Sequence, residues 1–387
     1  MYDILTLNNI SAAGLAELDP EKYSVGADKE APDAILVRSA KMHDMEFAPN
    51  TLAIARAGAG TNNVPVDRCA EEGIVVFNTP GANANAVKEL VLCSLFLTSR
   101  KIIPGIDFAN SLKGKGDEVG KLVEKGKSAF AGPELLGKTL GVIGLGAIGV
   151  RVANAARNLG MKVYGYDPYL SVDAAWNLSS HIIHAKSVDE IFENSDYITV
   201  HVPLTDDTKD TISKESFAKM KDGVRIVNFS RGGLVNTADM LEALESGKVA
   251  AYATDFAEDA LLGVPGVIAM PHLGASTPES EDNCARMAAY ELVEYLENGN
   301  IRNSVNMPNA DMARTCKNRL CVIHKNVPNV LSGITGQFVD SNINDFMNRS
   351  KGEIAYTILE VDGDITDEAV TTIEQIPGVI RVRAIRG

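Results

Sequence analysis

The chain has 387 residues, of which 45% are hydrophobic and 23% are charged, and its formal net charge at pH 7 is −14. This length and composition are typical of a globular protein with two or three domains and a substantial core. The acidic balance argues against nucleic-acid binding, which needs clustered Lys and Arg, and an anionic substrate would require local basic residues in its cleft.

Two further features restrict the class of protein. The longest apolar stretch, residues 90–97, is too short to cross a bilayer, and Asp3 and Asn8 interrupt the pattern of a secretory signal. The five cysteines are scattered and include no CxxC pair. We therefore expect a cytoplasmic protein with reduced thiols, no metal site and no membrane association.

Strand and helix patterns alternate along most of the chain, which predicts an α/β protein. Residues 1–88 are expected to form a small α/β unit with strands at 34–38 and 52–55, and a helix follows from about Ala86. Residues 113–127, rich in Lys, Gly and Glu, are typical of an exposed loop. A βαβ series then continues to about His272, and an amphipathic helix is expected from Glu279 until Gly299 stops it.

The C-terminal part of the chain changes character. The expected elements there are a strand at 318–325, a helix at about 328–340, strands at about 344–348 and 353–361, a helix at about 367–375 and a strand at 379–385. This βαββαβ order is that of the ferredoxin-like motif.

A nucleotide-binding motif lies between two predicted strands. An apolar strand runs into Gly144-Leu-Gly146-Ala147-Ile148-Gly149, and a helix and a second strand follow. In this context the first glycine permits a tight turn, the second lets the backbone approach a pyrophosphate, and the third lets helix and strand pack closely. The pyrophosphate would lie at the helix N-terminus, where free N–H groups favour negative charge.

Asp167 ends the second of these strands. Its carboxylate can accept hydrogen bonds from the adenosine ribose and would repel a 2′-phosphate, and no Arg or Lys follows at once. The sequence therefore predicts NAD rather than NADP as cofactor. The alternative is a surface Asp that only ends a strand.

Three later segments place polar residues at the ends of predicted strands, where open α/β sheets bind their ligands. The first ends in Ser230-Arg231-Gly232-Gly233, and the planar guanidinium of Arg231 can hold a substrate carboxylate through two hydrogen bonds. A solvated arginine without a role is the alternative.

The second segment carries Asp255, Glu258 and Asp259, and the third ends at His272. Oxidation of a hydroxy acid requires a base for the hydroxyl proton. Histidine has a suitable pKa, and a nearby carboxylate would orient its ring and stabilise the imidazolium. We therefore expect His272 to be the acid/base, the alternative being a core histidine with a packing role.

Other strand ends are assigned to the cofactor site. His201 ends a strand and could line the cofactor cleft, although a packing role fits the pattern equally well. No grouping of His, Cys and Asp has metal-ligand spacing. The remaining residues assigned to the cofactor site are Pro203, Thr208 and Gly274.

The segments 144–149, 228–233 and 271–276, together with Asp255, resemble in order and spacing the D-isomer-specific 2-hydroxyacid dehydrogenases. Motifs at 38–39, 56–61 and 78–83 are similar to those of members that oxidise 3-phosphoglycerate to 3-phosphohydroxypyruvate with NAD, the first step of serine synthesis. The resemblance covers essentially the whole chain, because the C-terminal part is similar to the ACT domains of many members.

The resemblance implies an α/β chain of two Rossmann-like doubly wound domains and a C-terminal ferredoxin-like ACT domain. The substrate domain would be discontinuous, with residues 1–88 and 275–306, and residues 89–274 would bind NAD. Residues 317–387 would form the ACT-like regulatory domain. A homodimer through the nucleotide domain is implied, with larger assembly through the ACT-like domain.

The resemblance also implies roles for individual residues. Arg231 would bind the substrate carboxylate and polarise the reacting oxygen, and His272 would be the acid/base. Ser230 and Asp255 would lie beside the nicotinamide carboxamide. Contacts with the carboxylate or phosphate of 3-phosphoglycerate are implied for Arg38, Ser39, Arg56 and Asn83.

The chain departs from the family pattern in two places. The acid that partners the histidine is usually a Glu in a D-V-F-x-x-E-P-like stretch, which is shortened here, so either Glu258 or Asp259 could serve, with Glu258 preferred. In the ACT-like part, Asn329 replaces a ligand-loop glycine and adds a side chain where backbone would approach a ligand. The residues that could still hold serine are His324, Asn326 and Asn342, although Asn329 argues against feedback inhibition.

Two other functions are compatible with the sequence. One is a hydroxypyruvate or glyoxylate reductase, or another D-2-hydroxyacid dehydrogenase, on the same scaffold, although such enzymes less often carry an ACT-like part. The other is an NAD-sensing corepressor of the same fold, against which the ACT-like part argues.

Overall fold

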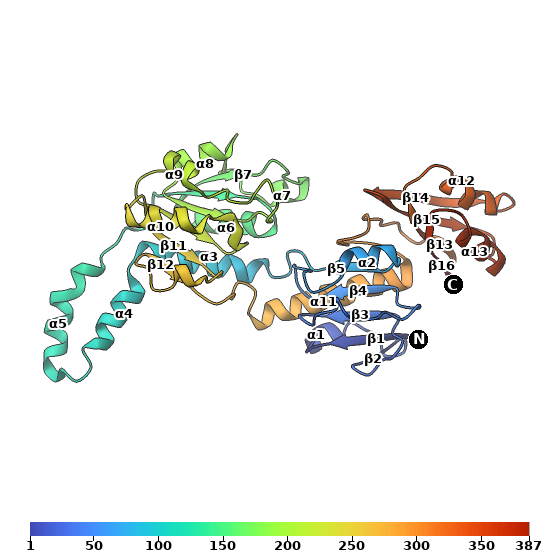
Figure 1. Ribbon diagram of the computed structural model, residues 1–387, viewed down its shortest axis with the longest axis horizontal. Coiled ribbons are helices and arrows are strands. Elements are labelled where there is room, and N and C mark those ends of the chain that lie inside the picture. The colour runs from blue at the N-terminus through green and yellow to red at the C-terminus, as the bar shows by residue number, and fades with distance from the viewer. Residues whose placement is uncertain (387) are drawn as a thin grey trace. The chain divides into compact units, whose positions relative to one another are not determined.

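The structure, a computed structural model, describes residues 1–386 and divides into two compact units (Figure 1). Unit 1 comprises Met1–Asn83 together with the chain from Pro278 onwards, and unit 2 comprises Ala84–Thr277. Within the described residues, no helix is both long enough and apolar enough to cross a membrane.

Unit 2 is built on a parallel sheet of seven strands in the order β12-β11-β10-β9-β6-β7-β8. Its side chains alternate between two cores, one on each face, with Ile226 of β10 in one and Val227 in the other. Chain order reverses beside β6, which pairs with β7 on one side and with β9 on the other. The strands are β6 (Thr139–Ile143), β7 (Lys162–Tyr166), β8 (Ile183–His184), β9 (Tyr197–Val200), β10 (Val224–Asn228), β11 (Val249–Thr254) and β12 (Val267–Ala269).

Unit 2 contains eight α-helices among the described residues, of which the sequence did not predict α4 and α5. Their bounds are α3 (Ala84–Ser99), α4 (Ile102–Ser111), α5 (Val119–Gly126), α6 (Ala147–Asn158), α7 (Val172–Asn177), α8 (Val188–Asn194), α9 (Lys214–Lys219) and α10 (Thr237–Glu245).

The segment 113–127, predicted to be an exposed loop, is largely helical, so that prediction is wrong. Helices α4 and α5 form a hairpin that extends away from the sheet of unit 2 (Figure 1). The rings of Phe108 and Phe130 lie 5.2 Å apart, and a Cβ added at Gly126 would overlap Phe108. Glycine in α5 therefore permits close helix packing there rather than marking a loop.

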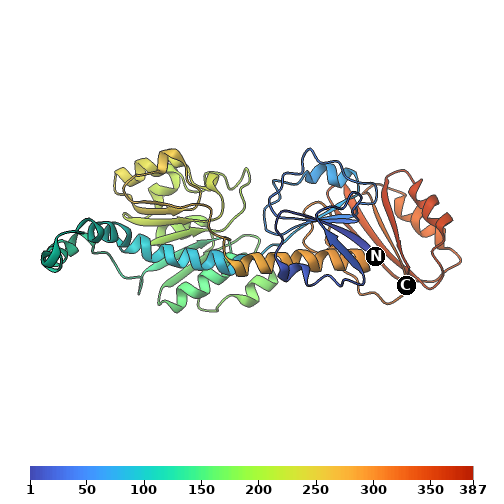
Figure 2. The ribbon, with the colours of Figure 1, turned by 90° about the horizontal axis from the view of Figure 1, so that it is seen from below.

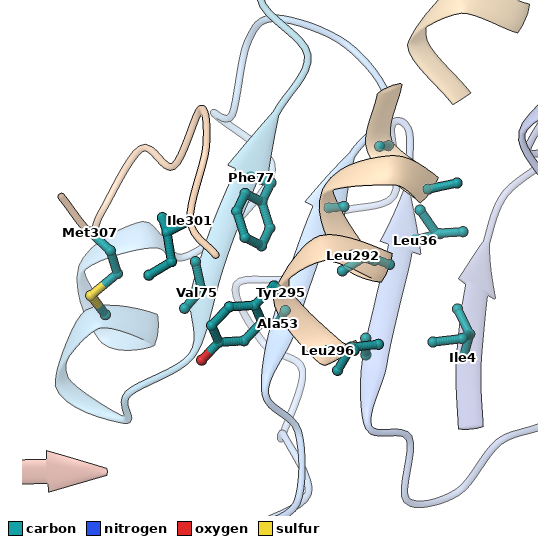
Figure 3. Packing of buried hydrophobic residues seen from close by; sticks show 14 of the residues in the cluster. Ile4, Leu36, Ala53, Val75, Phe77, Leu292, Tyr295, Leu296, Ile301 and Met307 are labelled. Atoms are coloured by element: carbon teal, nitrogen blue, oxygen red, sulfur yellow. The ribbon is translucent and has the colours of Figure 1, made fainter. Parts of the chain in front are cut away.

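Unit 1 contains a parallel sheet of five strands in the order β2-β1-β3-β4-β5. Helix α11 (Pro278–Asn298) covers one face, where Leu292, Tyr295 and Leu296 pack against strand residues such as Phe77 (Figure 3). Gly299 ends this helix with a φ of 72°, a conformation that glycine adopts readily. The other elements are β1 (Tyr2–Leu7), α1 (Ala12–Leu15), β2 (Tyr23–Gly26), β3 (Ala34–Val37), β4 (Ala53–Arg56), α2 (Val66–Glu71) and β5 (Val75–Asn78).

The C-terminal part of unit 1 has the predicted βαββαβ order and an antiparallel sheet, β14-β15-β13-β16. Residues of β13 alternate between its faces: Leu320 and Val322 contribute to a core with α12 and α13, whereas Cys321 and Ile323 join the core around α11. The elements are β13 (Asn318–Lys325), α12 (Val330–Thr335), β14 (Ile343–Lys351), β15 (Ile354–Val361), α13 (Asp367–Glu374) and β16 (Val379–Ile385).

Side chains of this C-terminal part cap the C-terminal end of α11, the long helix of unit 1 in Figure 2. Arg383 donates hydrogen bonds to the carbonyl oxygens of Tyr295 and Leu296, at 3.0 and 2.9 Å. Positive charge at a helix C-terminus is favourable because the helix dipole is negative there. The other caps are Arg314 to the carbonyl of Glu297 (3.2 Å), Arg319 to that of Asn298 (2.7 Å) and Tyr356 to that of Gly299 (2.7 Å).

The residues that the sequence assigned to a serine site in the ACT-like part have partners or a special backbone conformation of their own. Asn329 adopts a φ of 72°, so it keeps the left-handed backbone that a glycine would adopt. His324 is buried, and its ring nitrogens lie 2.8 Å from the carbonyl oxygen of Lys325 and 2.9 Å from Oγ1 of Thr357. Asn342 is hydrogen-bonded to Asn344.

Candidate active site

The glycine-rich turn lies at the carboxyl end of β6, where the strand order of unit 2 reverses. Gly144 has a φ of 91°, and its N–H donates to the carbonyl of Tyr166 at 2.8 Å. A Cβ at Gly149 would overlap the Gly144 carbonyl, whereas a Cβ at Gly146 would project into open space at the start of α6. The turn therefore fits a pyrophosphate, which binds at such a helix N-terminus.

The carboxylate of Asp167 faces this turn. Its Oδ2 accepts a hydrogen bond from the backbone N–H of Leu145, and its Oδ1 accepts one from Tyr169, both at 2.8 Å. Each carboxylate oxygen has two lone pairs, so both can still accept from a ribose hydroxyl. The ribose contact stays a prediction.

His201 and Thr208 follow β9, next to β6. The backbone N–H of His201 donates to the carbonyl of Ile143 at 2.7 Å, and its Nε2 lies 3.0 Å from Oγ1 of Thr199. Burial lowers the pKa of His201 to about 4, which keeps the imidazole neutral, and its buried Nδ1 has no partner among residues 1–386. Thr208 donates to the Pro203 carbonyl at 2.6 Å and so shapes the turn itself.

Arg231 follows β10 in a loop held by Asn228, a residue that the sequence argument did not single out. The Asn228 side chain donates to the Arg231 carbonyl at 2.8 Å and accepts from the Ser230 N–H at 3.1 Å. Ser230 donates its hydroxyl to the Val202 carbonyl at 2.7 Å, which ties the ends of β10 and β9 together. The Arg231 guanidinium is exposed and donates to the Ser230 carbonyl at 2.6 Å, and it pairs with no carboxylate of the described chain.

Asp255 and His272 interact at the ends of β11 and β12. Burial raises the pKa of the Asp255 carboxyl, whereas the Gly274 N–H and the nearby His272 charge oppose that rise. Oδ2 of Asp255 accepts from the Gly274 N–H at 3.1 Å, and its buried Oδ1 has no partner within residues 1–386. The His272 ring is exposed and lies 5.0 Å from the ring of Phe256, at an interplanar angle of 58°.

Neither predicted acid partner is hydrogen-bonded to His272 in the described structure. Oε2 of Glu258 accepts instead from the Thr237 hydroxyl at 2.8 Å, and Asp259 begins a short 3-10 helix. A Cβ at Gly232 would lie 3.9 Å from Oε1 of Glu258, which places this carboxylate beside the Arg231 loop. The choice between Glu258 and Asp259 stays a prediction.

The predicted substrate residues Arg38 and Arg56 lie at the ends of adjacent strands in unit 1. Nη2 of Arg38 is 2.6 Å from Oε1 of Glu281, and Nε of Arg56 donates to the Arg38 carbonyl at 3.0 Å. A Cβ at Gly58, whose φ is 147°, would overlap the Arg56 guanidinium, so glycine makes room for this side chain. Asn83 directly precedes α3.

Asn8 is a second residue that the sequence did not single out. Its Oδ1 accepts hydrogen bonds from the backbone N–H groups of Ser39 and Ala40, at 3.0 and 2.6 Å. Its own φ is 69°, so the turn after β1 carries a left-handed Asn that holds the Ser39 loop.

Comparisons with known proteins identify relatives of this chain. The profile of the NAD-binding domain of D-isomer specific 2-hydroxyacid dehydrogenases matches residues 107–274. D-3-phosphoglycerate dehydrogenase of Bacillus subtilis is 35% identical in an alignment over 327 residues that covers 80% of this chain and 59% of that protein. Hydroxypyruvate reductase of Thermotoga maritima is 41% identical in an alignment over 277 residues that covers 68% of this chain and 83% of that protein.

Solved structures support the same fold. The NAD⁺-bound 3-phosphoglycerate dehydrogenase of Entamoeba histolytica has a TM-score of 0.59 at 26% identity and covers 79% of this chain and 98% of its own. The chain spans 59%, 65% and 53% of the lengths of the D-3-phosphoglycerate dehydrogenases from Bacillus subtilis, Methanocaldococcus jannaschii and Archaeoglobus fulgidus.

Proposed function

Because the chain belongs to the D-isomer-specific 2-hydroxyacid dehydrogenase family, we propose that it oxidises 3-phosphoglycerate to 3-phosphohydroxypyruvate with NAD. The observation that carries this proposal is the order of three neighbouring strands. β10, β11 and β12 are adjacent and parallel, so Arg231, the acids 255–259 and His272 follow carboxyl ends at one edge of one sheet. Ligands of open α/β sheets bind at this edge.

Each residue has a distinct task in the proposed reaction. NAD, when bound, supplies the hydride acceptor. Arg231 holds the substrate carboxylate, since its guanidinium is exposed and lacks a carboxylate partner in the described chain. His272 takes the hydroxyl proton, and a carboxylate, Glu258 in preference to Asp259, stabilises the resulting imidazolium.

The proposed cofactor contacts follow the turn and the neighbouring strand ends. The turn 144–149 holds the pyrophosphate and Asp167 the ribose. Ser230 and Asp255 lie beside the carboxamide, and the segment 201–208 lines the cleft. The Nδ1 of the neutral His201 supports this assignment, because it is a buried polar atom without a partner among residues 1–386.

Phosphate recognition is assigned to unit 1. The guanidinium groups of Arg38 and Arg56 provide positive charge in a chain whose net charge is −14. We propose that they bind the phosphate together with Ser39 and Asn83. The names of relatives such as the Bacillus subtilis D-3-phosphoglycerate dehydrogenase support this choice of substrate.

A substrate panel with NAD and NADP side by side tests the proposal. NADH production should be faster with 3-phosphoglycerate than with D-glycerate or D-lactate at equal concentration, and NADP should support little turnover. Equal rates for the three acids would contradict the proposed preference for a phosphorylated substrate.

A second candidate function is hydroxypyruvate reduction. It is favoured by the 41% identity to the Thermotoga maritima hydroxypyruvate reductase, of which this chain covers 83%. Faster NADH consumption with hydroxypyruvate than with 3-phosphohydroxypyruvate would select it.

We further propose a homodimer through unit 2, with the ACT-like part available for larger assembly. Ile102, Ile103 and Ile106 of α4 are 41%, 42% and 54% exposed. Such clustered apolar exposure is typical of an interface, and a second copy of this unit is the proposed partner. Light scattering of the wild-type chain and of an Ile103→Lys, Ile106→Lys variant tests it, because the variant should be monomeric.

A further inference from the structure

Arg38, which we assign to phosphate binding, already has an anionic partner within unit 1. Its Nη2 lies 2.6 Å from Oε1 of Glu281, and the two side chains are 40% and 42% exposed. Arg38 directly follows β3, and Glu281 lies in the first turn of α11. The pair is thus accessible to a ligand and is not part of the buried core.

We propose that Glu281 is a specificity-determining residue, which makes Arg38 available to a phosphate but not to a carboxylate. This inference rests on the proposed function. An incoming anion must displace Glu281 or share the guanidinium with it. A carboxylate carries the same single charge as Glu281 and gains nothing by the exchange, whereas a phosphomonoester carries about −1.5 to −2 at pH 7.

A second arginine is held next to Arg38. Nε of Arg56 donates to the backbone carbonyl of Arg38 at 3.0 Å, so the two arginines assigned to phosphate binding are tied together. With Glu281 in place, the Arg38 side chain is already paired with one negative charge, so a dianion competes for it more strongly than a monoanion does.

The size of the effect follows from exposure. A half-exposed ion pair is weakly held, since solvent screens its attraction. Displacement of Glu281 by a dianion is therefore feasible, and removal of its charge should alter selectivity by about threefold to fivefold rather than by orders of magnitude.

The test compares three substrates with NAD in the wild-type chain and in Glu281→Gln. They are 3-phosphoglycerate; D-malate, a 2-hydroxy diacid whose second acid is a carboxylate; and D-lactate, which has no second anionic group. In the variant, kcat/KM for D-malate should rise about threefold to fivefold, that for 3-phosphoglycerate by less than about twofold, and that for D-lactate should not change.

A matched control removes a comparable charge elsewhere. Glu17 lies 3.7 Å from Arg286 of α11, and the side chains of Arg286 and Glu17 are 53% and 52% exposed. Glu17→Gln should leave the ratio of D-malate to 3-phosphoglycerate turnover unchanged. Circular dichroism checks that both variants are folded.

The outcomes separate this inference from the proposed function. If the wild-type chain prefers 3-phosphoglycerate and Glu281→Gln keeps the same substrate ratio, or raises KM for 3-phosphoglycerate, the competition is refuted while the proposed function stands. If the wild-type chain shows no preference for 3-phosphoglycerate over D-lactate, the proposed function itself fails.

Discussion

Arg319 and Glu360 form an ion pair in which both side chains are fully buried, with Nη2 and Nε at 2.6 and 2.8 Å from the same carboxylate oxygen. Glu360→Gln should lower the free energy of unfolding by about 3–5 kcal/mol, because it leaves the guanidinium charge buried without compensation. Urea unfolding measures the change.

The control for that variant is the exposed pair Lys214–Glu242. Glu242→Gln should cost less than about 1 kcal/mol, since solvent screens such a pair. Equal losses of stability in the two variants would contradict the importance of burial.

His272→Ala should reduce kcat by roughly 10²–10⁴-fold, the usual scale for loss of an acid/base. The exposed imidazole makes few packing contacts, so thermal unfolding and NADH binding, followed by fluorescence, should change little. A variant with nearly full activity would mean that another group moves the proton.

The acid partner of His272 can be assigned with two separate variants. Glu258→Gln should lower kcat and shift the acidic limb of the pH profile to lower pH, because the imidazolium loses its stabilising charge. Asp259→Asn should lower kcat by less than about twofold and should leave the acidic limb of the pH profile in place. If neither variant moves the profile, Asp255, which already interacts with His272, becomes the candidate.

The carboxyl group of Glu291 in α11 should make the stability of the folded chain depend on pH. Burial raises the pKa of its carboxyl to about 8 from an ordinary value of 4.5, and its one protein partner is the Asn303 amide at 2.8 Å among the described residues. The folded chain therefore keeps a proton that the unfolded chain releases. The stability contribution is full below the ordinary pKa and is lost as pH rises to about 8.

The neutral isostere Glu291→Gln should remove this dependence. Near about pH 9 the variant should be more stable than the wild type by roughly 2–4 kcal/mol, and near about pH 5 the two should agree closely. Urea unfolding across this range measures it, and a constant difference at all pH values would count against a buried neutral carboxyl.

Serine should leave steady-state turnover nearly unchanged. Both ring nitrogens of His324 have partners, and Asn342 is bonded to Asn344, so two of the three candidate serine contacts are already engaged. NADH production measured across a serine titration tests this. Strong inhibition would show that the ACT-like part rearranges to bind it.

The local pattern of the sequence predicted much of this fold. β13 and β16 span the predicted residues 318–325 and 379–385, and α11 ends where Gly299 was expected to stop it. In β13, period-two alternation directs Leu320 and Cys321 into different cores. The α4–α5 hairpin was missed because its helices depend on a packing contact, Gly126 against Phe108, that composition does not reveal.

Parts of the candidate site could likewise be predicted from the sequence, and other parts could not. Strand-end motifs predicted that Arg231 and His272 follow strands of one sheet, because adjacency of parallel strands follows from βαβ topology. The sequence could not predict that Thr237 holds Glu258, since the two lie on different elements. Nor could it predict the Arg38–Glu281 pair, whose members are 243 positions apart.

The caps on α11 have a consequence for synthesis on the ribosome. Helix α11 is translated before Arg314, Arg319, Tyr356 and Arg383, which satisfy its last carbonyl groups. A nascent chain that ends before these residues leaves the helix terminus to water and lacks Cys321, Ile323 and Ile358 of the shared core. Unit 1 therefore completes its folding only after strand β16 has left the exit tunnel.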